Sequence, residues 1–379
     1  MKILIAIDKF KECLSAIELT DIISAAVSDI YHDAEIIKKP IADGGEGFEE
    51  IIINNAGGKH IVCSAHFCTG ELIDSQYGIL TSDNTAIIEM AKTCALSKIP
   101  NSLRNPMNTS TFGMGEQILN AIKHNCNNIV IGLGGAGTHD MGLGLLQALG
   151  FAFYDYDGQL LENGGGAKQL TQIARIDDSK VASKIKKANY IIACDVDNPL
   201  LGAKGAAHTY APQKGATPEM VEQLEKGAAN FANVIKKHTD IDITRLKGGG
   251  AAGGVGAAMS ALLGAKMQSG IDLVIKYSQL EQDLAQGIDL AITGEGKMDN
   301  QSLNGKVPFG VAKICAKYKV PVMAFCGRLE NNCAELNKYF ASINEISPKD
   351  MDLAQAIKNT PQNLAKMVKQ VIIDWQKQS

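Results

Sequence analysis

Three features are absent from this 379-residue chain: Cys-x-x-Cys pairs, blocks of like charge, and hydrophobic runs of membrane-spanning length. Its nine cysteines are scattered and odd in number, so they cannot form a complete disulfide framework and are expected to be reduced thiols. No run approaches the roughly 20 apolar residues that a membrane helix needs. The 37 basic and 41 acidic residues are spread along the chain, so no polycation is available for nucleic acid or an acidic membrane surface. We therefore expect no nucleic-acid or membrane partner and favour small molecules.

The composition is that of a globular protein. A hydrophobic fraction of 45% is ample for a sizeable core, and the length suggests two or three domains of about 150 residues. The N-terminus, MKILIAIDKF, has a short apolar run before Asp8 and predicts a first strand instead of a signal peptide. A cytoplasmic protein is expected. The sequence leaves the oligomeric state open, and a homo-oligomer is one option.

The stretch 127–144, NNIVIGLGGAGTHDMGLG, predicts a buried strand that ends in a glycine-rich turn and opens a helix near Asp140. Ligands bind at such strand ends in α/β sheets, which makes Gly134, Gly135 and Asp140 candidates. The glycines also match G-x-G-x-x-G, with acidic residues following at about the spacing of a dinucleotide site. A nicotinamide-dependent oxidoreductase is therefore one alternative, although Asp157-Gly158 favours a hairpin turn over the end of a parallel strand.

Two N-terminal loops carry candidate catalytic residues. Lys9 and Lys11 follow the first strand and precede a helix predicted from the capping box Ser15-x-x-Glu18, where backbone N–H groups favour anions. Two solvated lysines are the alternative. The second loop, 42–47, reads ADGGEG. Glycines allow a close approach to ligand, and paired carboxylates suit a hydroxyl-activating base or magnesium, although Asp43 could instead form an Asx-turn.

The middle of the chain offers further candidates. Arg104 is a candidate clamp for carboxylate or phosphate, although a lone arginine is more often structural. Asp195 and Asp197 follow a buried strand and would share one side of an extended chain, where they could hold a metal or form turns before Pro199. The stretch 247–256, KGGGAAGGVG, cradles a ligand with its N–H groups or permits close helix packing.

Two regions of alternating strands and helices define the predicted architecture. Strands predicted at 2–7, 35–40, 290–293, 320–325 and 341–346 number five, as in a flavodoxin-like parallel sheet. The last predicted helix runs from 353 to 375. A local meander of strands begins near residue 65. We therefore predict an α/β protein with a flavodoxin-like domain, 1–65 plus 283–379, and an inserted mixed α/β domain, 66–282.

Read together, the loops resemble the type I glycerate kinase family. The matching stretches are DKFKECLSA at 8–16, PIADGGEG at 40–47, RNP at 104–106, GLGGAGTHD at 132–140, CDVDNPL at 194–200, PQKGA at 212–216, GAAGG at 250–254 and ITGEG at 292–296. The family usually has glycine and serine at Glu12 and Cys13, serine and alanine at Ala136 and Gly137, and asparagine at His139. The resemblance implies a flavodoxin-like domain with an inserted domain, and phosphorylation of D-glycerate with ATP and Mg²⁺, mostly on the 2-hydroxyl.

The chain lacks the P-loop and protein-kinase signatures, but glycines, lysines and carboxylates supply what phosphoryl transfer needs. The hypothesis is a D-glycerate 2-kinase that binds substrate and nucleotide between its two domains. The candidate residues are Asp43, Asp195, Lys9 and Lys11 for catalysis; Gly44, Gly45, Arg104, Gly134, Gly135, Asp140, Lys214, Gly253 and Lys306 for substrate and phosphate; and Glu46, Asp197 and Glu295 for the metal. A nicotinamide oxidoreductase and a non-catalytic two-lobed binding protein remain the alternatives.

Overall fold

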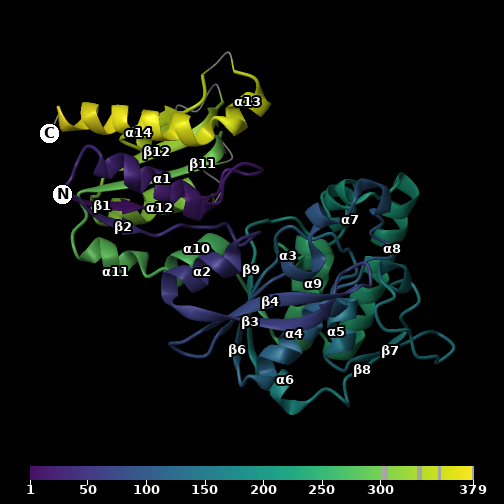
Figure 1. The fold of residues 1–379 in the computed structure, drawn as a ribbon. Helices are drawn as coiled ribbons and strands as arrows, with labels where there is room; N and C mark the ends of the chain where they lie inside the picture. Colours follow the sequence, from purple (N-terminus) through teal and green to yellow (C-terminus); the bar gives the residue numbers. More distant parts are fainter. Residues whose placement is uncertain (300–301, 303–305, 331–334, 349–350, 378–379) are drawn as a thin grey trace. The chain divides into compact units, whose positions relative to one another are not determined.

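The computed structural model describes residues 1–299, 302, 306–330, 335–348 and 351–377 (Figure 1). The chain divides into two compact units. The first unit contains 1–43, 54–56 and 271–379, and the second contains 44–53 and 57–270. Within the described residues, no helix is both long and apolar enough to cross a membrane.

The first unit is built on a parallel sheet with the order β13-β12-β11-β1-β2. Its strands are β1 (Lys2–Ile5), β2 (Glu35–Lys38), β11 (Leu290–Met298), β12 (Val322–Leu329) and β13 (Ser342–Glu345). In order of appearance the arrangement is 2-1-3-4-5, the order of flavodoxin-like folds. The prediction of a flavodoxin-like parallel sheet is therefore confirmed.

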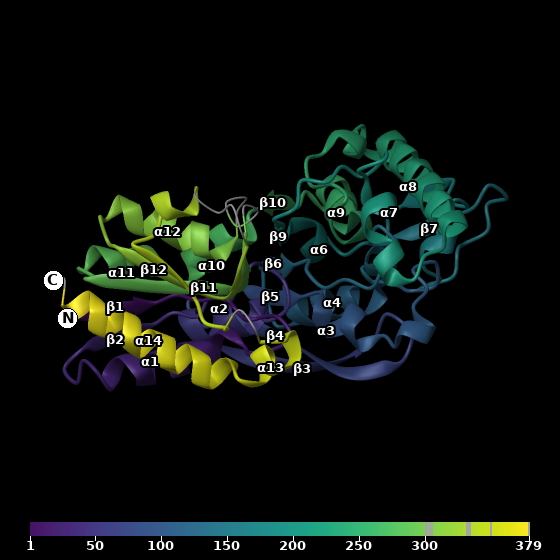
Figure 2. The same ribbon diagram turned by 90° about the horizontal axis from the view of Figure 1, so that it is seen from above.

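Helices cover both faces of this sheet (Figure 2). They are α1 (Ala16–Ser28), α10 (Gly270–Tyr277), α11 (Leu280–Ala285), α12 (Val307–Lys317), α13 (Leu353–Lys358) and α14 (Thr360–Gln376). α1 and α14 share a core with the sheet, in which Ile3 and Ile5 meet Leu19, Leu364 and Val368.

Local signals explain where these helices begin. Glu18 N–H donates to Ser15 Oγ at 3.2 Å, and Ser15 N–H donates to Glu18 Oε2 at 2.8 Å, so the predicted capping box is present. The prediction of one final helix from 353 to 375 is wrong, because the chain forms two helices that meet at Asn359. Pro361 has no N–H to continue the first helix, and it is tolerated in the first turn of the second.

The second unit contains a six-stranded mixed sheet with the order β10-β9-β6-β5-β4-β3. Its strands are β3 (Gly58–His66), β4 (Leu72–Leu80), β5 (Ala86–Glu89), β6 (Asn128–Gly132), β9 (Asn189–Ala193) and β10 (Lys266–Gln268). β3 and β5 are antiparallel to β4, whereas β5, β6, β9 and β10 are mutually parallel. A separate antiparallel pair joins β7 (Ala152–Tyr154) to β8 (Arg175–Asp177).

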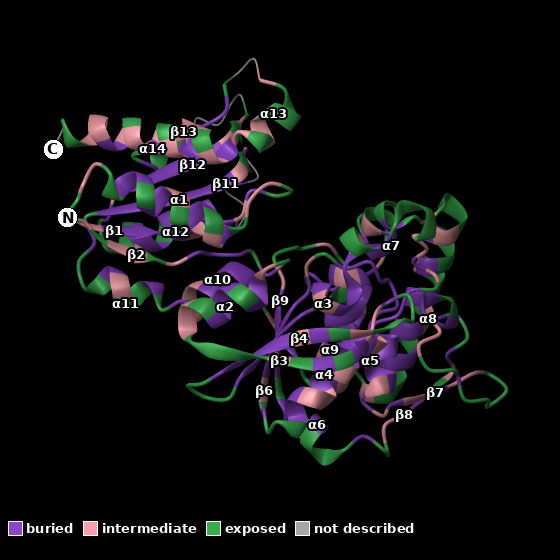
Figure 3. Ribbon diagram, in the orientation of Figure 1, coloured by how far each residue is buried: buried purple, intermediate pink, exposed green. Residues whose placement is uncertain are grey.

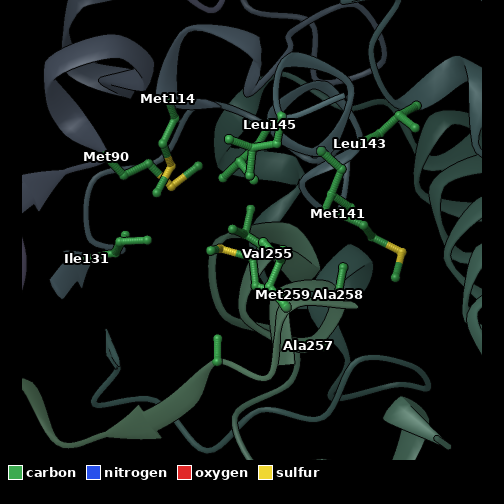
Figure 4. Packing of buried hydrophobic residues seen from close by; sticks show 14 of the residues in the cluster. Met90, Met114, Ile131, Met141, Leu143, Leu145, Val255, Ala257, Ala258 and Met259 are labelled. Carbon is green, nitrogen blue, oxygen red and sulfur yellow. The ribbon is translucent and has the colours of Figure 1, made fainter. Parts of the chain in front are cut away.

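The helices of this unit are α2 (Phe48–Ala56, whose residues 54–56 belong to the first unit), α3 (Ala91–Cys94), α4 (Phe112–Lys123), α5 (Leu143–Ala148), α6 (Ser183–Lys187), α7 (Ala206–Tyr210), α8 (Pro218–Thr239) and α9 (Val255–Leu263). Figure 3 shows buried residues running through the strands and along the inner faces of the helices. Part of this core packs Met90 and Met114 near Leu145 and Met259 (Figure 4). The core contains residues from the strands and from helices before and after β6. It therefore holds in place the loops at the ends of β5, β6 and β9.

Candidate active site

A cavity of about 620 Å³ opens in the first unit at the carboxyl ends of β1, β11 and β12. In an open parallel sheet, ligands bind outside the carboxyl ends of the strands where the strand order reverses. That reversal lies between β1 and β11 in this sheet. The cavity lining includes Lys9 after β1, Asp43 after β2, Glu295 and Lys306 from β11 and the loop after it, and Arg328 near the end of β12. Five charged groups from distant parts of the sequence therefore share one cavity.

Asp8 is a member of this group that the sequence analysis missed. It follows β1 directly, lines the cavity and accepts a hydrogen bond from Lys9 N–H at 2.8 Å. Burial raises the pKa of Asp8 well above its usual range, and the negative charges of Asp43 and Glu295 raise it further. An acid at the end of a buried strand, next to two candidate lysines, was the signal that could have identified it.

The carboxylate of Glu295 is fixed by two partners. Ser302 Oγ donates to Oε1 at 2.5 Å, and Lys306 Nζ lies 3.3 Å from Oε2 and 3.7 Å from Asp299 Oδ1. Burial raises the pKa of Glu295, whereas the hydrogen bond from Ser302 and the charge of Lys306 oppose that shift. The predicted pair Glu295 and Lys306 thus lies together at the cavity wall.

The grouping of Asp8, Asp43 and Glu295 fits a divalent cation by its chemistry. Crowded carboxylates are costly near a buried position, and a cation relieves their mutual repulsion. In the described part of the chain, no three acidic, histidine or cysteine side chains form a ready-made metal cage. Mg²⁺ does not require one, since it commonly binds one or two carboxylates together with substrate phosphates.

The glycines of the stretch 132–135 pack against the turn 44–47 within the second unit. A Cβ atom added at Gly134 would lie 2.3 Å from Gly45 Cα, and one added at Gly132 would lie 2.8 Å from Gly44 O. Gly134 N–H also donates to Gly44 O at 3.4 Å. These two glycines therefore allow backbone to approach backbone, which is a packing reason for part of the G-x-G-x-x-G pattern.

The turn 44–47 is held from a second side by Glu89, at the end of β5. Its Oε2 accepts hydrogen bonds from Gly47 N–H at 3.1 Å and from Glu49 N–H at 3.3 Å. A carboxyl oxygen at the N-terminus of α2 thus satisfies N–H groups that the helix leaves unpaired. Glu89 was not predicted from the sequence, because its role depends on a contact with residues far away in the chain.

The dinucleotide interpretation is not supported by the strands that follow. Asp155 and Asp157 lie in a tight turn, in which Asp155 N–H donates to Gln159 O at 2.9 Å. This turn follows β7, which pairs antiparallel with β8 and not with the parallel strands of the main sheet. The predicted hairpin turn is thus present, and neither Asp155 nor Asp157 stands at the end of a strand of the main parallel sheet.

Three predicted site residues are occupied by internal contacts of the second unit. Asp140 is fully buried and accepts hydrogen bonds from Thr111 N–H and Oγ1–H, and from Gly142 and Gly144 N–H. Arg104 donates from Nε to Ile99 O at 3.1 Å and from Nη2 to Leu96 O at 3.3 Å. These contacts hold the loops of both residues in place, which for Arg104 is the structural role named as its alternative.

Lys214 is the third of these residues. It is 3% exposed, and its Nζ donates to Thr138 O at 2.6 Å. Burial lowers the pKa of Lys214 to about 8, and the negative charge of Asp140 opposes that shift. The side chain therefore ties the turn 212–215 to the loop after β6.

Among the remaining candidates of the second unit, Asp195 is held by two hydrogen bonds. Asp195 Oδ1 accepts from Ser269 Oγ at 3.0 Å and from Gly270 N–H at 2.9 Å, and its Oδ2 lies 3.7 Å from a Cβ built at Gly44. The other candidates are Gly135, a glycine with φ of +74°; Gly253, with φ of +69° and packed on His139; Glu46, which is exposed; and Asp197, whose exposed carboxylate lies 3.2 Å from Lys247 Nζ. The structure thus brings Gly44 and Asp195 together and leaves Asp197 on the surface.

The chain is similar in sequence to known proteins. A family model described as the glycerate kinase family matches residues 3–376. The chain is 36% identical to a glycerate kinase of Bacillus cereus over 99% of its own length and 98% of the relative's. It is 40% identical to the glycerate 2-kinase of Escherichia coli, with 89% of this chain and 88% of the relative covered.

A solved structure is similar over the whole chain. The crystal structure of a protein assigned as glycerate kinase 2 from Salmonella typhimurium LT2 aligns with a TM-score of 0.88 and 37% sequence identity. The alignment covers 100% of this chain and 98% of the other. The match in sequence and in fold extends over both units, and the chain belongs to the glycerate kinase family.

Proposed function

We propose that this protein transfers the γ-phosphoryl group of ATP to the 2-hydroxyl of D-glycerate in a Mg²⁺-dependent reaction. The observation that carries the proposal is the cavity at the β1–β11 reversal, where lysines and carboxylates converge in a chain of the glycerate kinase family. Phosphoryl transfer depends on positioning and on stabilising negative charge, and both are supplied by such a set of side chains.

The cationic residues of the cavity would position the phosphates and the glycerate carboxylate. Lys9, Lys11, Lys306 and Arg328 all line it. Lys306 is already oriented by Glu295, so its ammonium group pays little entropy to meet an anion. Arg328 Nη1 lies 3.3 Å from Glu345 Oε1, which similarly orients its guanidinium group.

The acidic residues would divide the remaining tasks. Asp43 is exposed and faces the cavity, so it would orient or deprotonate the acceptor hydroxyl. Asp8 and Glu295 would hold Mg²⁺, which when bound neutralises charge on the phosphates. Asp195 stays the alternative base. Glu46 and Asp197 stay secondary metal candidates, because neither lines this cavity.

The choice of the 2-hydroxyl rests on relatives. The Escherichia coli relative is named glycerate 2-kinase, and the Salmonella structure is assigned as glycerate kinase 2. Neither name establishes the position for this chain. The product therefore has to be identified directly.

The test is to incubate the purified protein with ATP, Mg²⁺ and D-glycerate, to measure ADP release, and to identify the product by ³¹P NMR. The proposal expects ADP and 2-phosphoglycerate in equal amounts, with no turnover when glycerate is left out. Formation of 3-phosphoglycerate would change the position. ATP binding without any ADP release would favour the non-catalytic binding protein, and NAD⁺ reduction by a hydroxy acid would favour the oxidoreductase.

A further inference from the structure

The cavity of the first unit has two chemically different ends. One end carries the charged groups that follow β1, β11 and β12. The other end is lined by Phe10, Cys13, Met351, Leu353 and Ile357, none of which carries a charge, and the charged Glu12 lies between the first two in the same loop. These residues come from the loop before α1 and from the segment that contains α13, which Figure 1 draws at the end of the sheet where β11 terminates.

The whole cavity is larger than D-glycerate alone can fill. A volume of about 620 Å³ is in the range of pockets that enclose ligands of nucleotide size. D-glycerate is small and polar throughout, so it gains little from an apolar wall. A nucleoside triphosphate has a charged phosphate chain at one end and a flat apolar base at the other. Its charged and apolar parts could therefore match those of the cavity.

The exposure of Leu353 favours a ligand at this end. Its side chain is 77% exposed, the largest exposed fraction among the large hydrophobic residues of the described chain, although it lines the cavity. Burying such a side chain against a ligand is favourable, because its apolar surface leaves water. A planar base over Leu353 would supply that burial.

The two walls of the apolar end are also joined before any ligand binds. Cys13 Sγ–H donates to Ile357 O at 3.4 Å, which links the loop before α1 to α13. The loop is tight, since Phe10 and Leu14 exchange hydrogen bonds of 2.9 and 3.1 Å across it. Asp352 accepts from Gln355 N–H at 2.9 Å and caps α13. The walls are thus pre-formed, which reduces the entropy cost of binding.

We infer that the apolar end, formed by Phe10, Cys13, Met351, Leu353 and Ile357, binds the base of the nucleotide while the charged end binds its phosphates. This inference rests on the proposed function, since it assigns the nucleotide of that reaction to this cavity. It makes Cys13 and Leu353 contacts of the base and gives α13 a role in nucleotide affinity.

The first test is alkylation of Cys13 in the intact protein, followed by mass spectrometry of each cysteine peptide. Cys194 is the internal reference, because it is also partly exposed and its thiol also donates to a nearby carbonyl. Saturating MgATP should slow Cys13 alkylation at least tenfold relative to Cys194. Inorganic tripolyphosphate, which has no base, and D-glycerate should leave the rate within twofold.

The second test is Leu353→Asp, with Leu160→Asp as its matched control. Leu160 is 63% exposed and lies outside the cavity. The Leu353 variant should raise KM for ATP at least tenfold and leave KM for D-glycerate within twofold, whereas the control should change neither. Both variants should keep the circular dichroism spectrum of the parent, because both positions are exposed.

The outcomes separate the inference from the proposed function. If tripolyphosphate protects Cys13 as well as ATP does, or if Leu353→Asp raises KM for D-glycerate instead of ATP, the base does not bind here and the inference is overturned. The same holds if ATP is turned over normally while Cys13 stays fully reactive. If no glycerate phosphorylation occurs under any condition, the proposed function itself fails.

Discussion

The ammonium nitrogen of Lys214 lies 2.6 Å from the main-chain oxygen of Thr138, inside the second unit, where the lysine is almost completely buried. Burial lowers the pKa of this lysine from its usual 10.5 to about 8. Between these two values the unfolded chain binds more protons at Lys214 than the folded chain does. The free energy of unfolding should therefore rise with pH across that window.

We predict that Lys214→Met removes this contribution. Relative to the variant, the wild type should gain stability from about pH 8 to about pH 10.5, by on the order of 3 kcal/mol in total. Urea unfolding of both proteins at several pH values measures the difference and cancels groups that they share. If the free energies of unfolding of the two proteins changed with pH in parallel, the pKa of Lys214 would be the same in the folded and the unfolded chain.

A second prediction concerns Gly134. A Cβ atom there would lie 2.3 Å from Gly45 Cα, so Gly134→Ala should destabilise the protein by about 2 kcal/mol or more. Gly256→Ala is the control, because it lies in α9 and its Cβ would meet other atoms only at 3.5 Å. That change should be neutral or stabilise by up to about 1 kcal/mol. Equal unfolding free energies for the two variants would argue against close packing of the turn 44–47.

Asp43 is the subject of the third prediction. Asp43→Asn keeps the volume and removes the charge, so kcat should fall roughly 10²- to 10⁴-fold if the carboxylate orients or deprotonates the hydroxyl. Thermal unfolding should change little, since the side chain is exposed. Asp33→Asn, at another exposed aspartate of the first unit, should keep full activity. Near-wild-type turnover in Asp43→Asn would move the role of base to Asp195.

The fourth prediction concerns the metal. Removing Mg²⁺ with EDTA should abolish turnover, and adding Mg²⁺ back should restore it. Asp8→Asn should raise the Mg²⁺ concentration needed for half-maximal rate at least tenfold, because one of the carboxylates that would bind the ion is lost. Asp74→Asn, at an exposed aspartate of β4, should leave the Mg²⁺ dependence unchanged. An unaltered dependence in Asp8→Asn would assign the ion to other ligands.

A fifth prediction concerns the two units. Joining residue 43 to residue 271 should leave a soluble five-stranded α/β protein without kinase activity. Removing only 66–282 should leave a less soluble product, since β3 would lose β4, with which it pairs along its whole length. Size-exclusion chromatography and circular dichroism compare the two deletions. Aggregation of both would show that the first unit depends on the second for folding.

Local signals made the fold of the first unit predictable. Apolar runs defined its five strands, and the Ser15–Glu18 capping box marked the start of α1. Both signals lie within a few residues of the structure they specify. The break at Asn359 was visible in the same way, because Pro361 was present in the sequence and its effect was overlooked.

The candidate site was harder to predict because chemical type does not reveal burial. Lys9 and Lys214 are both lysines, yet one lines the cavity and the other is enclosed among the loops of the second unit. Asp140, a candidate ligand-binding acid, is fully buried and receives hydrogen bonds from Thr111, Gly142 and Gly144. These differences depend on contacts between residues far apart in the chain, which no local pattern records.

The pairing of β1 with β11 also has a consequence for synthesis of the chain on the ribosome. Ile3 pairs with Leu290, so the first strand lacks its central neighbour until most of the chain has been made. At about 5 to 20 residues per second, that delay is roughly 15 to 60 s. All segments of the second unit emerge earlier and can fold first. Until β11 has been synthesised, the apolar edge of β1 is unpaired, and a chaperone could bind it.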